Sequence, residues 1–184
     1  DYISTSALAL NNGTIKDASE NAATLTLASP GGTNSLGNSK AIIVDGIVPT
    51  VSSVASSSSN GNYKIGDVIG ITLTFSEAVT VSGTPQITLE TGSSDAVVNY
   101  TSGSGGTTLT FNYTVSEGNA SSDLDYVSTS ALALNSGSIL DASGNSASLA
   151  LASPGAANSL GANAALLVDG VLPTIAVVSS TSNN

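Results

Sequence analysis

The sequence predicts an all-β fold built from tandem repeats. A long segment recurs at a fixed offset, apolar residues alternate with polar ones in short runs, and turn-forming residues separate those runs. Gly, Ser, Thr and Asn are abundant beside Val, Ile and Leu, and no stretch carries the apolar stripe of an amphipathic helix. Small polar and β-branched residues in this pattern favour strands.

The repeat indicates the domain organisation. The sequence DYISTSALAL at 1–10 returns as DYVSTSALAL at 125–134, an offset of 124 residues, and the two copies match at 37 of 60 positions without a gap. A repeat of this length is the size of a whole small domain, whereas solenoid coils repeat every ~20–50 residues. The chain therefore resembles a section of a string of domains.

The linker VDGIVPT at 44–50, copied as VDGVLPT at 168–174, marks the domain boundaries. Pro49 cannot occupy a central strand, and Gly46 lets the backbone turn. We therefore expect the C-terminal part of a preceding repeat at 1–46, a complete repeat at 47–170, and the first strand of a following repeat at 171–184. This hypothesis treats the chain as a window on a much longer protein.

Alternation of period two marks the strands. Every second residue is apolar from Ile69 to Phe75 and from Leu109 to Val115. Turn residues such as Asn60-Gly61 separate the apolar runs. The other expected strands are 50–56, 84–90, 96–101, 126–134, 148–151 and 164–168. Seven or so short antiparallel strands predict immunoglobulin-like β-sandwich repeats in tandem.

Charge and composition exclude several classes of partner and site. The net charge is −10, from thirteen carboxylates and three lysines. Nucleic acid and anionic membranes are excluded as partners, because phosphate binding needs clustered Lys or Arg. The absence of cysteine excludes disulfides and thiolate metal sites, and no apolar run is long enough for a membrane span. These features fit a location outside a bacterial cell.

Four motifs in a fixed order carry a family resemblance: FSEAV at 75–79, LTFNYTV at 109–115, DASGN at 141–145, and the linker at 168–174. With them, the chain resembles the tandem immunoglobulin-like or cadherin-like repeats of giant bacterial cell-surface proteins. These proteins include type I secreted adhesins and the swimming-associated surface proteins of cyanobacteria. The first copy departs at DASEN (17–21), where Glu20 replaces glycine. The resemblance implies a rod or filament of neighbouring repeats that serves cell adhesion, with calcium stiffening the junctions.

The carboxylates fall in loops that the predicted topology gathers at the two ends of the sandwich. Ca²⁺ takes six to eight oxygen ligands from such loops. We expect one junction site from Asp45, Glu77 and Asp141, with Asp1 supplied by the preceding repeat as the copy of Asp125. A second site would use four further acids and a domain beyond this chain: Glu117, Asp123, Asp125 and Asp169. The alternative is that these acids are solvated turn formers.

Composition also limits catalysis. Without His, Cys or Arg, catalytic triads and arginine-based phosphoryl clamps are impossible. A pair of carboxylates could still hydrolyse a glycoside. Three functions therefore remain: a non-enzymatic structural spacer, which we expect; a glycan- or cell-binding module, with Tyr63 or Tyr100 as contacts; and, less favoured, a glycosidase. Tyr126 and its copy Tyr2 are expected to brace a strand rather than to stack on a ligand.

Overall fold

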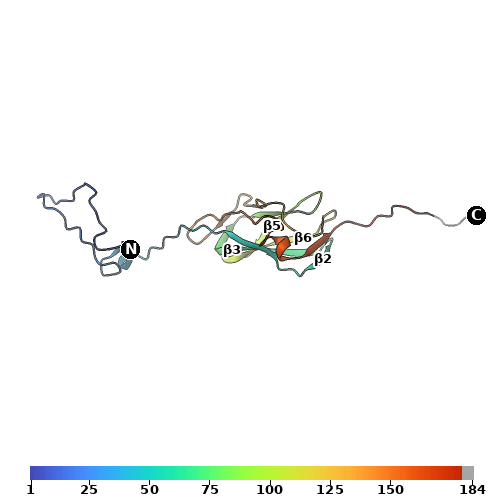
Figure 1. The fold of residues 1–184 in the computed structure, drawn as a ribbon, viewed down its shortest axis with the longest axis horizontal. Coiled ribbons are helices and arrows are strands. Elements are labelled where there is room, and N and C mark those ends of the chain that lie inside the picture. The colour runs from blue at the N-terminus through green and yellow to red at the C-terminus, as the bar shows by residue number, and fades with distance from the viewer. Residues whose placement is uncertain (180–184) are drawn as a thin grey trace, which may run out of the picture. The chain divides into compact units, whose positions relative to one another are not determined.

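A computed structural model describes residues 1–179 and confirms the all-β class. The chain divides into two compact units, Asp1–Asp45 and a second unit from Gly46 onward. The sequence had placed this boundary after Gly46. All ten strands of the described residues lie in the second unit (Figure 1).

The larger sheet of the second unit has seven strands. Their order is β1-β3-β6-β5-β4-β8, and β9 pairs with the C-terminal end of β3. All of these pairings are antiparallel. The strands are β1 (Val51–Ser56), β3 (Val68–Ser82), β4 (Gln86–Leu89), β5 (Ala96–Ser102), β6 (Gly106–Thr114), β8 (Leu132–Ala133) and β9 (Ser138–Leu140).

The smaller sheet has three strands in the order β2-β10-β7. They are β2 (Gly61–Lys64), β7 (Ala120–Ser121) and β10 (Leu166–Asp169). The sequence had predicted antiparallel pairing throughout. That prediction is wrong for this sheet, because β10 is antiparallel to β7 but parallel to β2.

The core forms around β3 and β6, where the predicted alternation is confirmed. Ile71 pairs with Phe111 and Leu73 with Leu109, and all four side chains are fully buried. Burying a large apolar side chain stabilises a fold by about 1.5–3 kcal/mol. The last third of the repeat closes this core with further fully buried side chains, which include Tyr126, Ile139, Leu160 and Leu166.

Two predicted strands are largely absent. Segment 126–134 forms a strand only at β8, because Ser128 starts a turn: its carbonyl accepts from the Ala131 amide at 3.1 Å, and its Oγ accepts from the Ser130 amide at 3.3 Å. Such local hydrogen bonds compete with a β ladder. Segment 148–151 makes a single bridge, between Thr50 and Ser148.

The sequence also missed short elements. β2, β7 and β9 were not expected, nor were the two helical turns α1 (Leu36–Ser39) and α2 (Leu160–Asn163). Each turn has a serine N-cap, Ser35 or Ser159, whose side chain accepts from a backbone amide three residues on. The caps explain helix formation without an apolar stripe.

The first unit has little regular structure. Of the strand and helix elements it holds only α1, and one isolated bridge joins Lys16 and Ala22. Every buried apolar residue found in the described part of the chain belongs to the second unit. The first unit therefore has no closed apolar core of its own.

The predicted strand at 171–184 is described only as far as residue 179. Residues 171–179 form no strand, because a strand needs a hydrogen-bonding neighbour. Residues 180–184 lie outside the described part of the chain. Within residues 1–179, no helix is long and apolar enough to cross a bilayer.

Candidate metal centre

Three of the predicted ligands are close together. One carboxylate oxygen from each of Asp45, Glu77 and Asp141 lies within 4.8 Å of the other two. Oxygens that share one Ca²⁺ at 2.3–2.6 Å can be at most about 5 Å apart. The three acids could therefore hold one metal ion and supply three of its ligands, as the sequence predicted for the first site.

A bulge in β3 positions Glu77. The β3–β6 register is continuous from Val68 to Thr74 and resumes only at Val79, which lies opposite Gly106. Bulges bend a strand and redirect a side chain out of the ladder. The bulge is also tied to the start of β1, because the Thr50 amide donates to Ser76 Oγ at 3.0 Å and the Ser76 amide donates to the Thr50 carbonyl at 2.8 Å.

Asp141 is fixed by the loop that follows it. Its Oδ1 accepts hydrogen bonds from the amides of Ser143 and Asn145, both at 2.8 Å, and its Oδ2 accepts from Asn145 Nδ2 at 2.7 Å. The residue is 5% exposed. Each carboxylate oxygen has two lone pairs, so these bonds leave acceptor capacity for a cation.

The loop also sets the ionisation of Asp141. Burial favours a higher pKa, but hydrogen bonds from the Asn145 side chain and from the amides of Asn145, Ser143 and Gly144 outweigh it. The pKa of Asp141 therefore lies below its ordinary value. The side chain is a carboxylate at neutral pH, which is the form that a hard cation binds.

Asn145 was missed as a site residue, although the quoted motif DASGN ends with it. Its Nδ2 donates to Asp141 Oδ2 and also, at 3.3 Å, to the carbonyl of Ile47. Ile47 lies two residues after Asp45. The amide thus ties the Asp141 loop to the entry segment of the second unit.

Asp1 and Asp125 share a different, structural role. Asp125 accepts from the amides of Tyr126 at 2.9 Å and Gly155 at 2.8 Å, and it is 8% exposed. Asp1 accepts from the amides of Tyr2 and Gly31 at the same distances within the first unit. Both side chains therefore hold a local loop together.

The second predicted group is not brought together. This group consists of Glu117, Asp123, Asp125 and Asp169. Within residues 1–179, no three of these acids bring their carboxylate oxygens close enough together to share an ion. Asp125 is folded against the backbone of Gly155, whereas Asp169 is exposed at the end of β10 and accepts from the Val171 amide at 3.1 Å.

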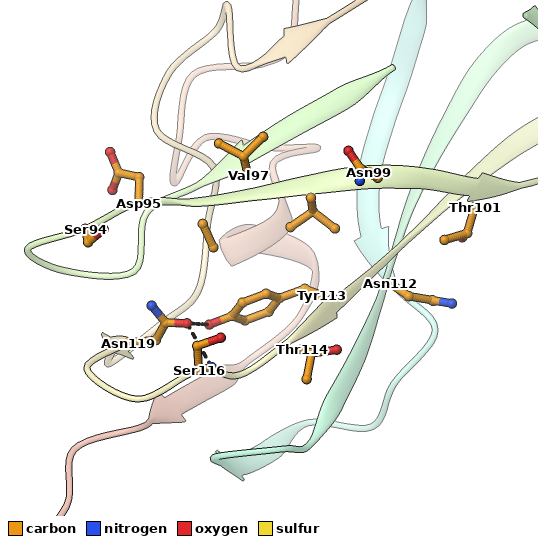
Figure 2. A pocket seen from close by; sticks show the side chains of 12 residues that line it. Ser94, Asp95, Val97, Asn99, Thr101, Asn112, Tyr113, Thr114, Ser116 and Asn119 are labelled. Carbon is orange, nitrogen blue, oxygen red and sulfur yellow. Dashed lines mark hydrogen bonds between the residues drawn. The ribbon is translucent and has the colours of Figure 1, made fainter. Parts of the chain in front are cut away.

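A polar groove opens where β5 and β6 separate. These strands pair only where Tyr100 and Ser102 meet Phe111 and Thr110, so the N-terminal half of β5 diverges from the end of β6. The groove holds about 470 Å³, and its side chains include Asp95, Val97, Asn99, Asn112, Thr114 and Asn119 (Figure 2). It contains one carboxylate, Asp95, whereas the two-carboxylate glycosidase considered from the sequence needs a second.

The tyrosines make internal contacts. Tyr100 packs edge-on against Phe111, and its hydroxyl accepts from the Ser104 amide at 2.8 Å; the Tyr63 hydroxyl donates to the Ser59 carbonyl at 2.5 Å. Both side chains are half-buried. Tyr126 is 1% exposed and donates to the Ala152 carbonyl at 2.7 Å, as expected of a bracing residue.

Comparisons with family models, with curated proteins and with solved structures found no match to this chain.

Proposed function

We propose that the chain is a structural spacer from a long extracellular bacterial surface protein, made of immunoglobulin-like sandwich repeats and stiffened by calcium. One observation carries the proposal: Asp45, Glu77 and Asp141 gather at the entry segment of the second unit. The 124-residue sequence repeat, the all-β fold and the acidic composition support it.

The ligand chemistry favours calcium over magnesium. The three acids come from an entry segment, a strand bulge and a loop, so they form an irregular set of oxygens. Ca²⁺ accepts irregular sets of six to eight oxygens, whereas Mg²⁺ demands a tight octahedron and keeps more water. Water would complete the sphere.

The proposed ion acts on shape. Asp45 precedes the second unit, and Glu77 and Asp141 belong to it. An ion bound by all three carboxylates would hold the entry segment on the sandwich. Without the ion, three negative charges within 4.8 Å repel one another, and this repulsion loosens the segment that the Asn145–Ile47 hydrogen bond still holds.

Calcium-dependent melting tests the site. Extracellular sites of this class bind with a Kd of about 0.1–1 mM. At a hundredfold excess over Kd, calcium should stabilise the folded state by about 2.7 kcal/mol, which raises the Tm by about 8 °C for a unit of this size. Glu77→Gln should abolish most of this shift, because it removes a charged ligand and keeps the side-chain shape.

Glu117→Gln is the matched control, since it removes the same charge outside the trio and should leave the calcium shift intact. A melting temperature that does not respond to calcium or chelator would refute the calcium site. An equal loss in both variants would show that only overall charge matters.

A glycan-binding module is the second candidate, because the groove between β5 and β6 is lined mainly by amides and hydroxyls. Such groups hydrogen-bond sugar hydroxyls. The two tyrosines expected to contact a glycan already make contacts within the protein: Tyr63 with the Ser59 carbonyl and Tyr100 with the Phe111 ring. Binding to a panel of oligosaccharides that is lost in Asn112→Trp would favour this function over the spacer.

A further inference from the structure

Residues 125–169 complete a fold that residues 47–124 cannot close. β10 pairs with β2 and β7, β8 extends the sheet beside β4, and α2 packs on β1. These elements bury Leu132, Leu160 and Leu166 to 3% exposure or less. The face that receives them is therefore a specific, mostly apolar recognition surface.

The first unit carries a second copy of the same completing segment. Leu8, Leu36 and Ile42 stand 124 residues before Leu132, Leu160 and Leu166. They are 42%, 47% and 60% exposed. Because the two segments match in sequence, residues 1–45 carry the same kinds of apolar groups that the 47–124 face accepts, and a segment exchange between identical chains is conceivable in kind.

Three consecutive positions differ between the copies at α2, and two of them, Asn163 and Ala164, are hydrogen-bonded to β1 or buried in the second copy. Asn163 Nδ2 donates to the Val54 carbonyl at 2.8 Å, and Ala164 is 6% exposed. The first copy has Ser39 and Lys40 at these positions. Serine lacks the amide donor, and a lysine in the space of a buried alanine must desolvate its ammonium group or displace its neighbours.

We propose that Ser39 and Lys40 are specificity residues that prevent residues 1–45 of one chain from replacing residues 125–169 on the 47–124 face of a second chain. Specificity of this kind comes from groups that penalise the wrong partner. In a tandem array, such groups would keep each repeat paired with its own last third. The inference concerns the folding register and does not rest on the calcium site.

A disulfide trap in the full chain tests the proposal. Ala120 and Asp169 are cross-strand partners, and Asp45 is the copy of Asp169. In Asp45→Cys/Ala120→Cys, an exchanged segment brings the two thiols of different chains together, and the chain has no other cysteine. The protein is unfolded under reducing conditions, refolded, oxidised, and analysed on a non-reducing gel for linked dimers and larger species.

Adding Ser39→Asn/Lys40→Ala to the trap should raise the linked fraction about tenfold, since it restores the part-buried hydrogen bond to the Val54 carbonyl and removes a charge from the buried position of Ala164. Asn38→Ala is the matched control: it makes the neighbouring exposed position equal to Ala162 and should change nothing. Ala120→Cys/Asp169→Cys should form its disulfide within one chain and remain monomeric.

Two results would overturn the proposal. One is a linked fraction that Ser39→Asn/Lys40→Ala leaves unchanged, including a fraction of zero in both chains. The other is a trap that already links most molecules with Ser39 and Lys40 in place, because the two residues would then exclude nothing.

Discussion

Residues 1–45 and 125–169 are two copies of one sequence in two surroundings. Several local hydrogen bonds are the same in both. The Tyr2 hydroxyl donates to the Ala28 carbonyl at 2.6 Å, and the Tyr126 hydroxyl donates to the Ala152 carbonyl at 2.7 Å. Asp17 accepts from Ser19 and Asn21 in the pattern that Asp141 repeats.

The backbone agrees as well. Glu20 and Gly144 both lie in the left-handed region, with φ of 71° and 90°, although glutamate rarely adopts it. The loop at Glu20 therefore keeps its conformation although glutamate replaces the glycine of the motif. A second pair, Asn34 and Asn158, also agrees, with φ of 69° and 71°.

Burial is what separates the copies. Ile139 is 1% exposed and its counterpart Ile15 is 48% exposed; Val168 is 3% exposed and Val44 is 90% exposed. The strands β8, β9 and β10 of the second copy have no strand counterparts in the first. Turns and caps form from neighbours in sequence, whereas strands and burial require partners from the remainder of the repeat, which residues 47–124 supply to the second copy.

The largest expected effect on this comparison comes from two matched leucine-to-alanine substitutions, one in each copy. Leu160→Ala should destabilise the second unit by about 3 kcal/mol, because it empties a fully buried site. Leu36→Ala removes the same side chain from the half-exposed copy and should cost less than about 0.5 kcal/mol. Chemical denaturation measures both, and equal costs would show that the first copy is packed.

Alkaline titration tests the burial of two tyrosines in the second unit, Tyr113 and Tyr126. Burial raises the pKa of Tyr113 to about 12; burial, and then the Asp125 charge, raise that of Tyr126 to about 12. The neutral phenols stabilise the fold fully below the ordinary pKa of 10, and this contribution is lost as pH rises from 10 towards 12.

Stability should therefore decline above pH 10, and ultraviolet absorbance should show two late-ionising phenols. Tyr126→Phe should leave one. Two late phenols remaining in that variant would contradict the assignment of Tyr126.

The smallest expected effect comes from making the loops equal. Gly144→Glu gives the second copy the residue of the first, and a Cβ at Gly144 meets no atom within 4 Å. The cost is then only that of a left-handed backbone, about 1 kcal/mol by denaturation. A much larger loss would mean that the Asp141 loop depends on surroundings that Asp17 lacks.

Sequence reasoning predicted part of the site. Asp45, Glu77 and Asp141 were grouped from loop order alone, and the structure places their oxygens together. Asp125 was grouped with Asp169, but its carboxylate binds backbone amides of its own loop. Loop order indicates which end of a sandwich a residue occupies, but not the direction of its side chain.

By itself, the sequence determined the repeat, the β class, the alternation in β3 and β6, and the local loops that both copies keep. All of these depend on residue type and short spacing, which act the same way in either copy. Only the tertiary structure decided the β3 bulge beside Glu77, the bridge from Asn145 to Ile47, and the parallel pairing of β10 with β2. Those features join residues far apart in the chain, and they exist only where the remainder of the repeat supplies the partners.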